Sequence, residues 1–155
     1  MQDVRSRALA MIERCGEADK LKTVIRNAQR KGDHEIVRAA SLKLYAVLPS
    51  AEPGTLEHDV WRSVFALEDS LKVERGRTTL LGRTRQKIAR DGELKTVVDL
   101  VSGKPSDGFE MLVVRGMVDH TFEAVALRHR ERFEDAVLEG ASKRLDARAS
   151  LDKLS

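Results

Sequence analysis

Apolar residues recur at three- and four-residue steps along most of the chain, which is the spacing of one face of an α-helix. The stripe formed by Val60, Val64, Leu67 and Leu71 shows this spacing clearly. Very few stretches alternate between polar and apolar residues as a half-buried strand would. The pattern therefore predicts an all-α fold, a compact irregular bundle of eight or nine helices.

Capping residues and glycines delimit the predicted helices. Gly16 is expected to end the first helix in the left-handed conformation, and Asp33 and Thr55 are expected to begin the third and fourth. Asp107, followed by Glu110 three residues later, has the spacing of a capping box. The expected helices are approximately residues 3–15, 17–31, 33–48, 55–75 and 79–90, a sixth that carries Leu94, Val97, Val98, Leu100 and Val101, and then 107–115, 121–130 and 134–148.

The chain has 155 residues, the length of one ordinary domain. We expect a single helical domain over residues 1–150, with a subdivision into 1–74 and 75–150 as the alternative, and a frayed tail over 151–155. Because there are only six aromatic residues, the core must consist mostly of Leu, Val, Ile and Ala. The fourth helix is expected to be the central core helix, with Trp61 buried and Leu67 in its apolar stripe.

Several classes of protein are disfavoured by composition. No stretch is long and apolar enough to span a membrane, and charged residues interrupt the N-terminal segment that could have served as a signal sequence. The single cysteine, Cys15, cannot form an intramolecular disulfide, and the four histidines are scattered. We therefore expect a cytoplasmic protein with no membrane contact, no metal and no cofactor.

Positive charge is concentrated in one short segment. The formal net charge is +3, but residues 75–90 contain six Lys or Arg and no Asp or Glu. Without this segment the protein would be net −3. Residues 49–74, just before it, carry two cations and six carboxylates. A strong local field of this kind needs an explanation.

The cationic segment has the composition of a phosphate-binding site. If it is helical from Thr79, the turn of about 100° per residue places Arg83, Lys87 and Arg90 on one face. The residues just before them lie where the free N–H groups and the dipole of a helix N-terminus favour phosphate. The predicted nucleic-acid-binding residues are Arg75, Arg77, Thr78, Thr79, Arg83, Lys87 and Arg90.

Other arrangements of these charges stay open. The cations could instead pair with the carboxylates of the fourth helix, forming a solvated face. Arg85 is expected to point toward Leu81 and to affect stability or an internal ion pair more than binding. The carboxylates of the fourth helix are Glu57, Asp59, Glu68, Asp69 and Glu74.

Two more specific interpretations have weaker support. A helix-turn-helix would place its turn glycine four residues after an alanine, whereas Gly92 follows Ala89 by three, which favours an ordinary helical hairpin capped by the glycine. Asp91, Glu93 and Asp99 could hold Mg²⁺ in a metal-dependent nuclease, but three acids in a chain that is 34% charged are not a motif. We expect no catalytic residues.

The leading prediction is a small non-enzymatic α-helical protein that binds nucleic acid by contacting phosphates through residues 75–90. DNA is favoured over RNA as the ligand. The alternative is a helical protein-interaction adaptor. In that alternative the basic segment docks an acidic protein partner, and the acidic fourth helix docks a basic one. The two surfaces would also complement each other across a homodimer.

Overall fold

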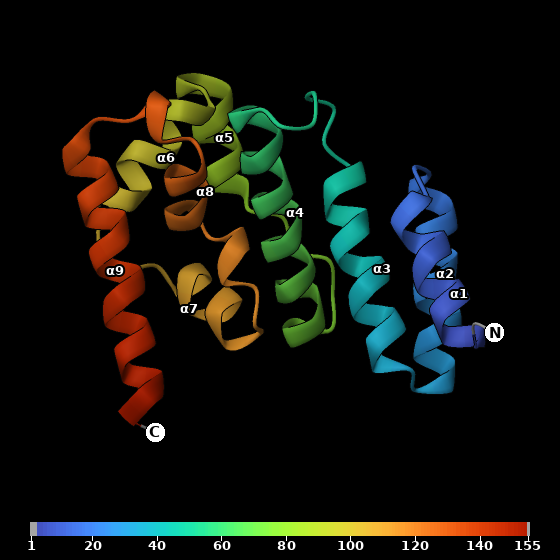
Figure 1. Cartoon of the computed structure of the whole chain (residues 1–155). Coiled ribbons are helices and arrows are strands. Elements are labelled where there is room, and N and C mark those ends of the chain that lie inside the picture. Colours follow the sequence, from blue (N-terminus) through green and yellow to red (C-terminus); the bar gives the residue numbers. More distant parts are fainter. Residues whose placement is uncertain (1–2, 155) are drawn as a thin grey trace. The chain divides into compact units, whose positions relative to one another are not determined.

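In the computed structural model, which describes residues 3–154, the chain forms helices and, within that range, no strand (Figure 1). No helix in that range is both long and apolar enough to cross a membrane. The prediction of an all-α fold with eight or nine helices is confirmed for these residues. The helices are α1 (Val4–Arg14), α2 (Ala18–Lys31), α3 (His34–Val47), α4 (Leu56–Arg75), α5 (Gly82–Asp91), α6 (Glu93–Ser102), α7 (Asp107–Val114), α8 (Phe122–Arg128) and α9 (Asp135–Leu154), with short 3₁₀ helices η1 (Val118–His120) and η2 (Arg130–Arg132).

The contacts within the chain divide it into two compact units, residues 1–50 and 51–155. This division falls in the loop between α3 and α4, whereas the subdivision suggested by the sequence lay between residues 74 and 75. The first unit comprises α1, α2 and α3 and has an apolar core of its own. That core is formed by Ile12, Leu21, Ala28, Ile36 and Ala40.

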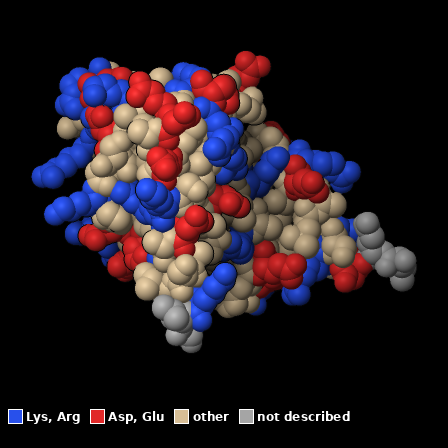
Figure 2. All heavy atoms as spheres, turned by 60° about the vertical axis from the view of Figure 1, so that its left-hand side comes forward, with Lys and Arg blue, Asp and Glu red and all other residues tan. Residues whose placement is uncertain are grey.

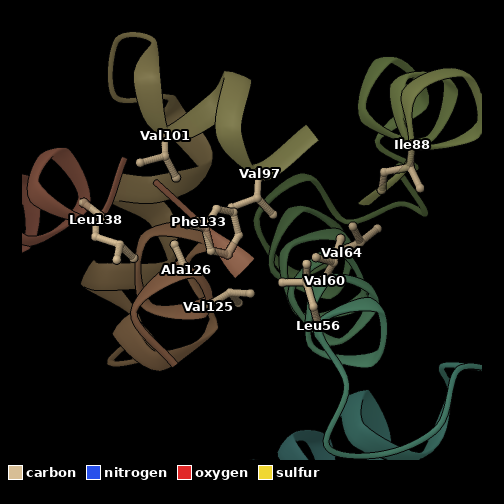
Figure 3. Packing of buried hydrophobic residues seen from close by; sticks show 11 residues of the cluster. Leu56, Val60, Val64, Ile88, Val97, Val101, Val125, Ala126, Phe133 and Leu138 are labelled. Atoms are coloured by element: carbon tan, nitrogen blue, oxygen red, sulfur yellow. The ribbon is translucent and has the colours of Figure 1, made fainter. Parts of the chain in front are cut away.

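The second unit has a larger core built around α4. Leu56, Val60 and Val64 recur every four residues along one side of this helix and are at most 1% exposed. Figure 3 shows them with Val97 of α6 and Phe133, which follows η2. This burial explains the stripe seen in the sequence and makes α4 the central helix of its unit.

Local sequence signals explain several helix ends. Gly32 ends α2 in the left-handed conformation, with φ of 70°, and the side chains of Asp33 and Thr55 accept N–H groups in the first turns of α3 and α4. The expected role of Gly16 is wrong, because Cys15 with φ of −76° caps α1. The capping box expected at Asp107 is wrong, because the cap of α7 is Ser106, whose Oγ accepts the N–H of Phe109, and Phe109 stands where a capping box needs Glu or Gln.

Two helix bounds differ substantially from the prediction. Helix α5 begins at Gly82, three residues later than expected, for a reason given below. Helix α9 continues to Leu154, so residues 151–154 are helical where we expected a frayed tail. Residue 155 lies outside the described residues.

Two side chains of α4 are less buried than predicted. Trp61 is half-buried at the edge of the core, with its ring centroid 6.1 Å from that of Phe65. Leu67 is also half-buried and lies against Gly108 of α7, where a Cβ atom would approach Leu67 Cδ2 to 2.6 Å. The glycine therefore allows α7 to lie close to α4 at this point.

Candidate nucleic-acid interface

The cationic segment 75–90 comprises the last residue of α4, a loop and most of α5. Arg75 ends α4, and Gly76 caps it in the left-handed conformation with φ of 72°. The Gly76 N–H donates to the carbonyl of Lys72 at 2.8 Å. The chain then turns away from α4 and crosses a loop before it re-enters helix at Gly82.

Glu68 of α4 fixes the start of α5. Its carboxylate accepts the backbone N–H of Leu81 at 2.8 Å and two guanidinium N–H groups of Arg85, each at 2.7 Å. The Arg85 guanidinium also lies 5.4 Å from the ring centroid of Trp61 and 5.7 Å from that of Phe65. Arg85 therefore forms an internal ion pair, one of the two roles expected for it, and the effect of replacing it on binding stays a prediction.

The contact between Glu68 and Leu81 also explains why the predicted helix start at Thr79 is wrong. Because a carboxylate of α4 takes the Leu81 N–H, this residue becomes the N-cap of α5. Thr78 and Thr79 therefore lie in the loop, and the Thr79 hydroxyl donates to the Arg77 carbonyl at 3.3 Å. The expected convergence of Arg77 and both threonines at the helix N-terminus does not occur.

Lys87 and Arg90 share a face of α5 with Arg83, as expected, but both contact carboxylates. Lys87 Nζ contacts Asp99 Oδ2 at 2.7 Å and Asp91 Oδ2 at 3.0 Å. Arg90 donates to Asp91 twice, at 3.1 Å. The hydrogen bonds from Arg90 and Lys87 lower the pKa of Asp91 from 3.8 to about 2, so this carboxylate stays charged at neutral pH.

Three arginines of the segment keep their charge available to a ligand. Arg75, Arg77 and Arg83 are exposed, and none of them forms an ion pair with a described residue. Arg83 lies in the first turn of α5, where the helix dipole adds to the positive field. We call these three residues the arginine surface, and they are the part of the predicted site whose charge is uncompensated.

The hairpin of α5 and α6 contains the residues considered for a helix-turn-helix and for a nuclease. Gly92, with φ of 87°, joins the two helices directly and caps α5, as expected for an ordinary hairpin. Asp91 and Asp99 both contact Lys87, as described above. Among the described residues, no group of three or more His, Cys, Asp or Glu side chains is placed to hold a metal ion.

The carboxylates of α4 are engaged with several different elements. Glu68 pairs with the cationic segment, but Glu57 contacts Arg132 at 3.4 Å, and Asp59 accepts a hydrogen bond from His129 Nε2 at 2.7 Å. On the face shown in Figure 2, cationic and anionic side chains are interspersed rather than separated. The expected acidic docking surface on α4 is therefore partly used in internal contacts.

A pocket of about 890 Å³ lies in the second unit and is lined mostly by residues of α4 and α7, both apolar and polar. Val73 and Val114, which line it, are 63% and 69% exposed. Arg115 Nη1 in its wall donates to Ser70 Oγ at 2.6 Å. Arg75 of the arginine surface also lines it. A volume of this size suits a small ligand or an apolar side chain of a partner.

None of the protein-family models, curated proteins or solved structures compared with the chain matches it.

Proposed function

We propose that the protein binds nucleic acid by contacting backbone phosphates through the arginine surface, with DNA favoured over RNA as the ligand. The observation that carries this proposal is that Arg75, Arg77 and Arg83 are exposed and without ion pairs to described residues, within nine consecutive positions. Their neighbours Arg85, Lys87 and Arg90 already have carboxylate partners. Half of the cations in this segment therefore pair with carboxylates outside it, and the other half stay exposed without such partners among the described residues.

Arginine suits phosphate because its planar guanidinium can donate two parallel hydrogen bonds to phosphate oxygens. Such contacts fix the position of the protein on the backbone but read no base sequence. Binding should therefore depend strongly on salt and weakly on sequence, because each phosphate contact releases condensed counterions.

The arginine surface is tested by changing all three residues to alanine. We expect log affinity for a 20-base-pair duplex to depend less on log salt, with a slope shallower by up to about 2.7, since each lost phosphate contact removes about 0.9. Fluorescence anisotropy at 50 to 200 mM salt measures this slope. Folding should be unaffected, because the three side chains are exposed.

A charge-matched control separates this surface from a general effect of net charge. Arg130, Lys143 and Lys153 are exposed cations of η2 and α9, and changing all three to alanine alters the net charge equally. The slope should stay close to that of the wild type. Equal losses in the two triple variants would show that the arginine surface has no special role.

The second candidate function is a protein-interaction adaptor, which is favoured by the pocket with its exposed Val73 and Val114. This candidate predicts a partner protein that stays bound after copurified material is treated with nuclease. The Val114→Asp variant should lose that partner, because a carboxylate would be placed in the apolar contact. Nucleic acid that copurifies before treatment, with no protein retained afterwards, supports the first candidate instead.

A further inference from the structure

A second group of exposed cations, without ion pairs in the described part of the chain, lies on α2, in the first unit. This helix contains five Lys or Arg and one Asp. Lys22, Arg26 and Arg30 follow one another at four-residue steps, so successive side chains are only about 40° apart around the helix. All three are exposed, and none has an ion pair with a described residue. We call these three residues the α2 stripe.

Hydrogen bonds hold the stripe in place without neutralising it. Arg26 donates to the Thr23 hydroxyl at 3.2 Å, and Arg30 donates to the side-chain carbonyl of Asn27. Both acceptors are neutral, so the guanidinium charges are not compensated. This differs from α5, where Lys87 lies between two carboxylates.

Apart from Arg30, which lies in the last turn of α2 where the helix dipole favours a cation, the α2 stripe contributes little to the fold. Like charges four residues apart destabilise a helix by a few tenths of a kcal/mol per pair, and the stripe contains two such pairs. The packing of α2 comes instead from its other face, where Leu21 is fully buried and Ala28 is 5% exposed. A cationic row that opposes helix stability is better explained by a ligand than by structure.

The geometry points to a nucleic-acid backbone as the ligand of the α2 stripe. We propose that Lys22, Arg26 and Arg30 form a second phosphate-binding surface, an inference that rests on the proposed function. From Lys22 to Arg30 the α-helix rises about 12 Å, which is about the length of duplex axis occupied by three to four nucleotides of one strand. A membrane surface fits less well, because a helix that lies on lipid inserts its apolar face, and that face of α2 is buried in the protein.

The test changes Lys22, Arg26 and Arg30 to alanine in the full chain and measures binding to the same 20-base-pair duplex. We expect the slope of log affinity against log salt to become shallower by up to about 2.7, which reduces the loss of affinity between 50 and 200 mM salt by about 40-fold. The midpoint temperature of thermal unfolding should be unchanged or slightly higher, because like-charge pairs are removed.

A charge-retaining control tests whether the stripe acts through its charge. The Arg26→Lys and Arg30→Lys double variant keeps the cations, and lysine also binds phosphate as a point charge. The slope of log affinity against log salt should therefore stay within about 0.9 of the wild-type value, which corresponds to one phosphate contact. If the double variant behaves like the alanine variant, the contact is not electrostatic and the inference is wrong.

The outcomes separate this inference from the proposed function. If the α2 variant binds like the wild type while the arginine-surface variant is weakened, the α2 inference is overturned and the proposed function stands. If only the α2 variant is weakened, the α2 inference holds and the arginine surface is not the contact. If the wild-type chain does not bind duplex at 50 mM salt, both are overturned. If poly-glutamate binds the chain as tightly as the duplex does, the stripe is assigned to an acidic protein partner, and the inference of a nucleic-acid site is overturned.

Discussion

Replacing Glu68 with alanine is expected to lower the free energy of unfolding by about 2 to 4 kcal/mol. The carboxylate is 9% exposed, and it accepts three hydrogen bonds, one from the Leu81 N–H and two from Arg85. Its removal leaves the Leu81 N–H and the guanidinium without their acceptor, and such losses cost more than the pair itself contributes. Urea unfolding followed by circular dichroism measures the change.

Two further variants show where the effect of Glu68 comes from. Glu74 is an exposed carboxylate of the same helix, and its replacement by alanine should change stability by less than about 0.5 kcal/mol. Glu68→Gln keeps a side-chain carbonyl that can accept the Leu81 N–H, so it should lose less stability than Glu68→Ala. If Glu68→Ala is no more costly than Glu74→Ala, Glu68 does not hold α5 against α4.

Replacing Asp59 with alanine is expected to cost about 2 to 3 kcal/mol. Asp59 accepts a hydrogen bond from His129 at 2.7 Å and lies 3.4 Å from Arg128 and 3.6 Å from Arg62. Without the carboxylate, two guanidinium groups and the imidazole remain together with no anion between them. Glu57→Ala is the matched control, because its contact with Arg132 is more exposed and should contribute less than about 1 kcal/mol.

The effect of Asp59 should also depend on pH. Burial raises the pKa of Asp59, but the hydrogen bond from His129 and the nearby Arg128 and Arg62 outweigh it, so the pKa lies below its usual value of 3.8. A carboxylate with a lowered pKa stabilises the folded state above about pH 4 and loses this contribution as the pH falls further. The stability difference between wild type and Asp59→Ala should therefore narrow in acid. A difference that is constant from pH 7 to pH 2.5 would contradict the assigned ion pairs.

Features fixed by neighbouring residues could be predicted from the sequence. The helix ends at Gly32, Thr55 and Gly76 depend on one residue and the adjacent turn, and they are found where the sequence places them. The apolar stripe of α4 was also evident, because its period is a local property. The start of α5 could not be predicted in this way, because it is set by Glu68, which lies thirteen residues before Leu81 in the chain.

The ion pairs of the cationic segment also depend on residues that are distant in the chain. Lys87 was assigned to a free cationic face because residues 75–90 contain no acid, but Asp99 reaches it across the α5–α6 turn. The α2 stripe was overlooked although its spacing is plain in the sequence. Its charge is diluted when residues 1–48 are summed, because that stretch also contains six carboxylates. Counting charge by helix face rather than by segment would have found Lys22, Arg26 and Arg30.

The central claim is that uncompensated cations on α2 and around the start of α5 bind nucleic-acid phosphates. The most direct test is the salt dependence of wild-type binding to a 20-base-pair duplex between 50 and 200 mM salt. If all six residues of the two surfaces contact phosphate, the slope of log affinity against log salt should approach about −5.4, and the arginine surface alone gives about −2.7. No measurable binding at 50 mM salt, or an affinity that does not change with salt, would contradict the account.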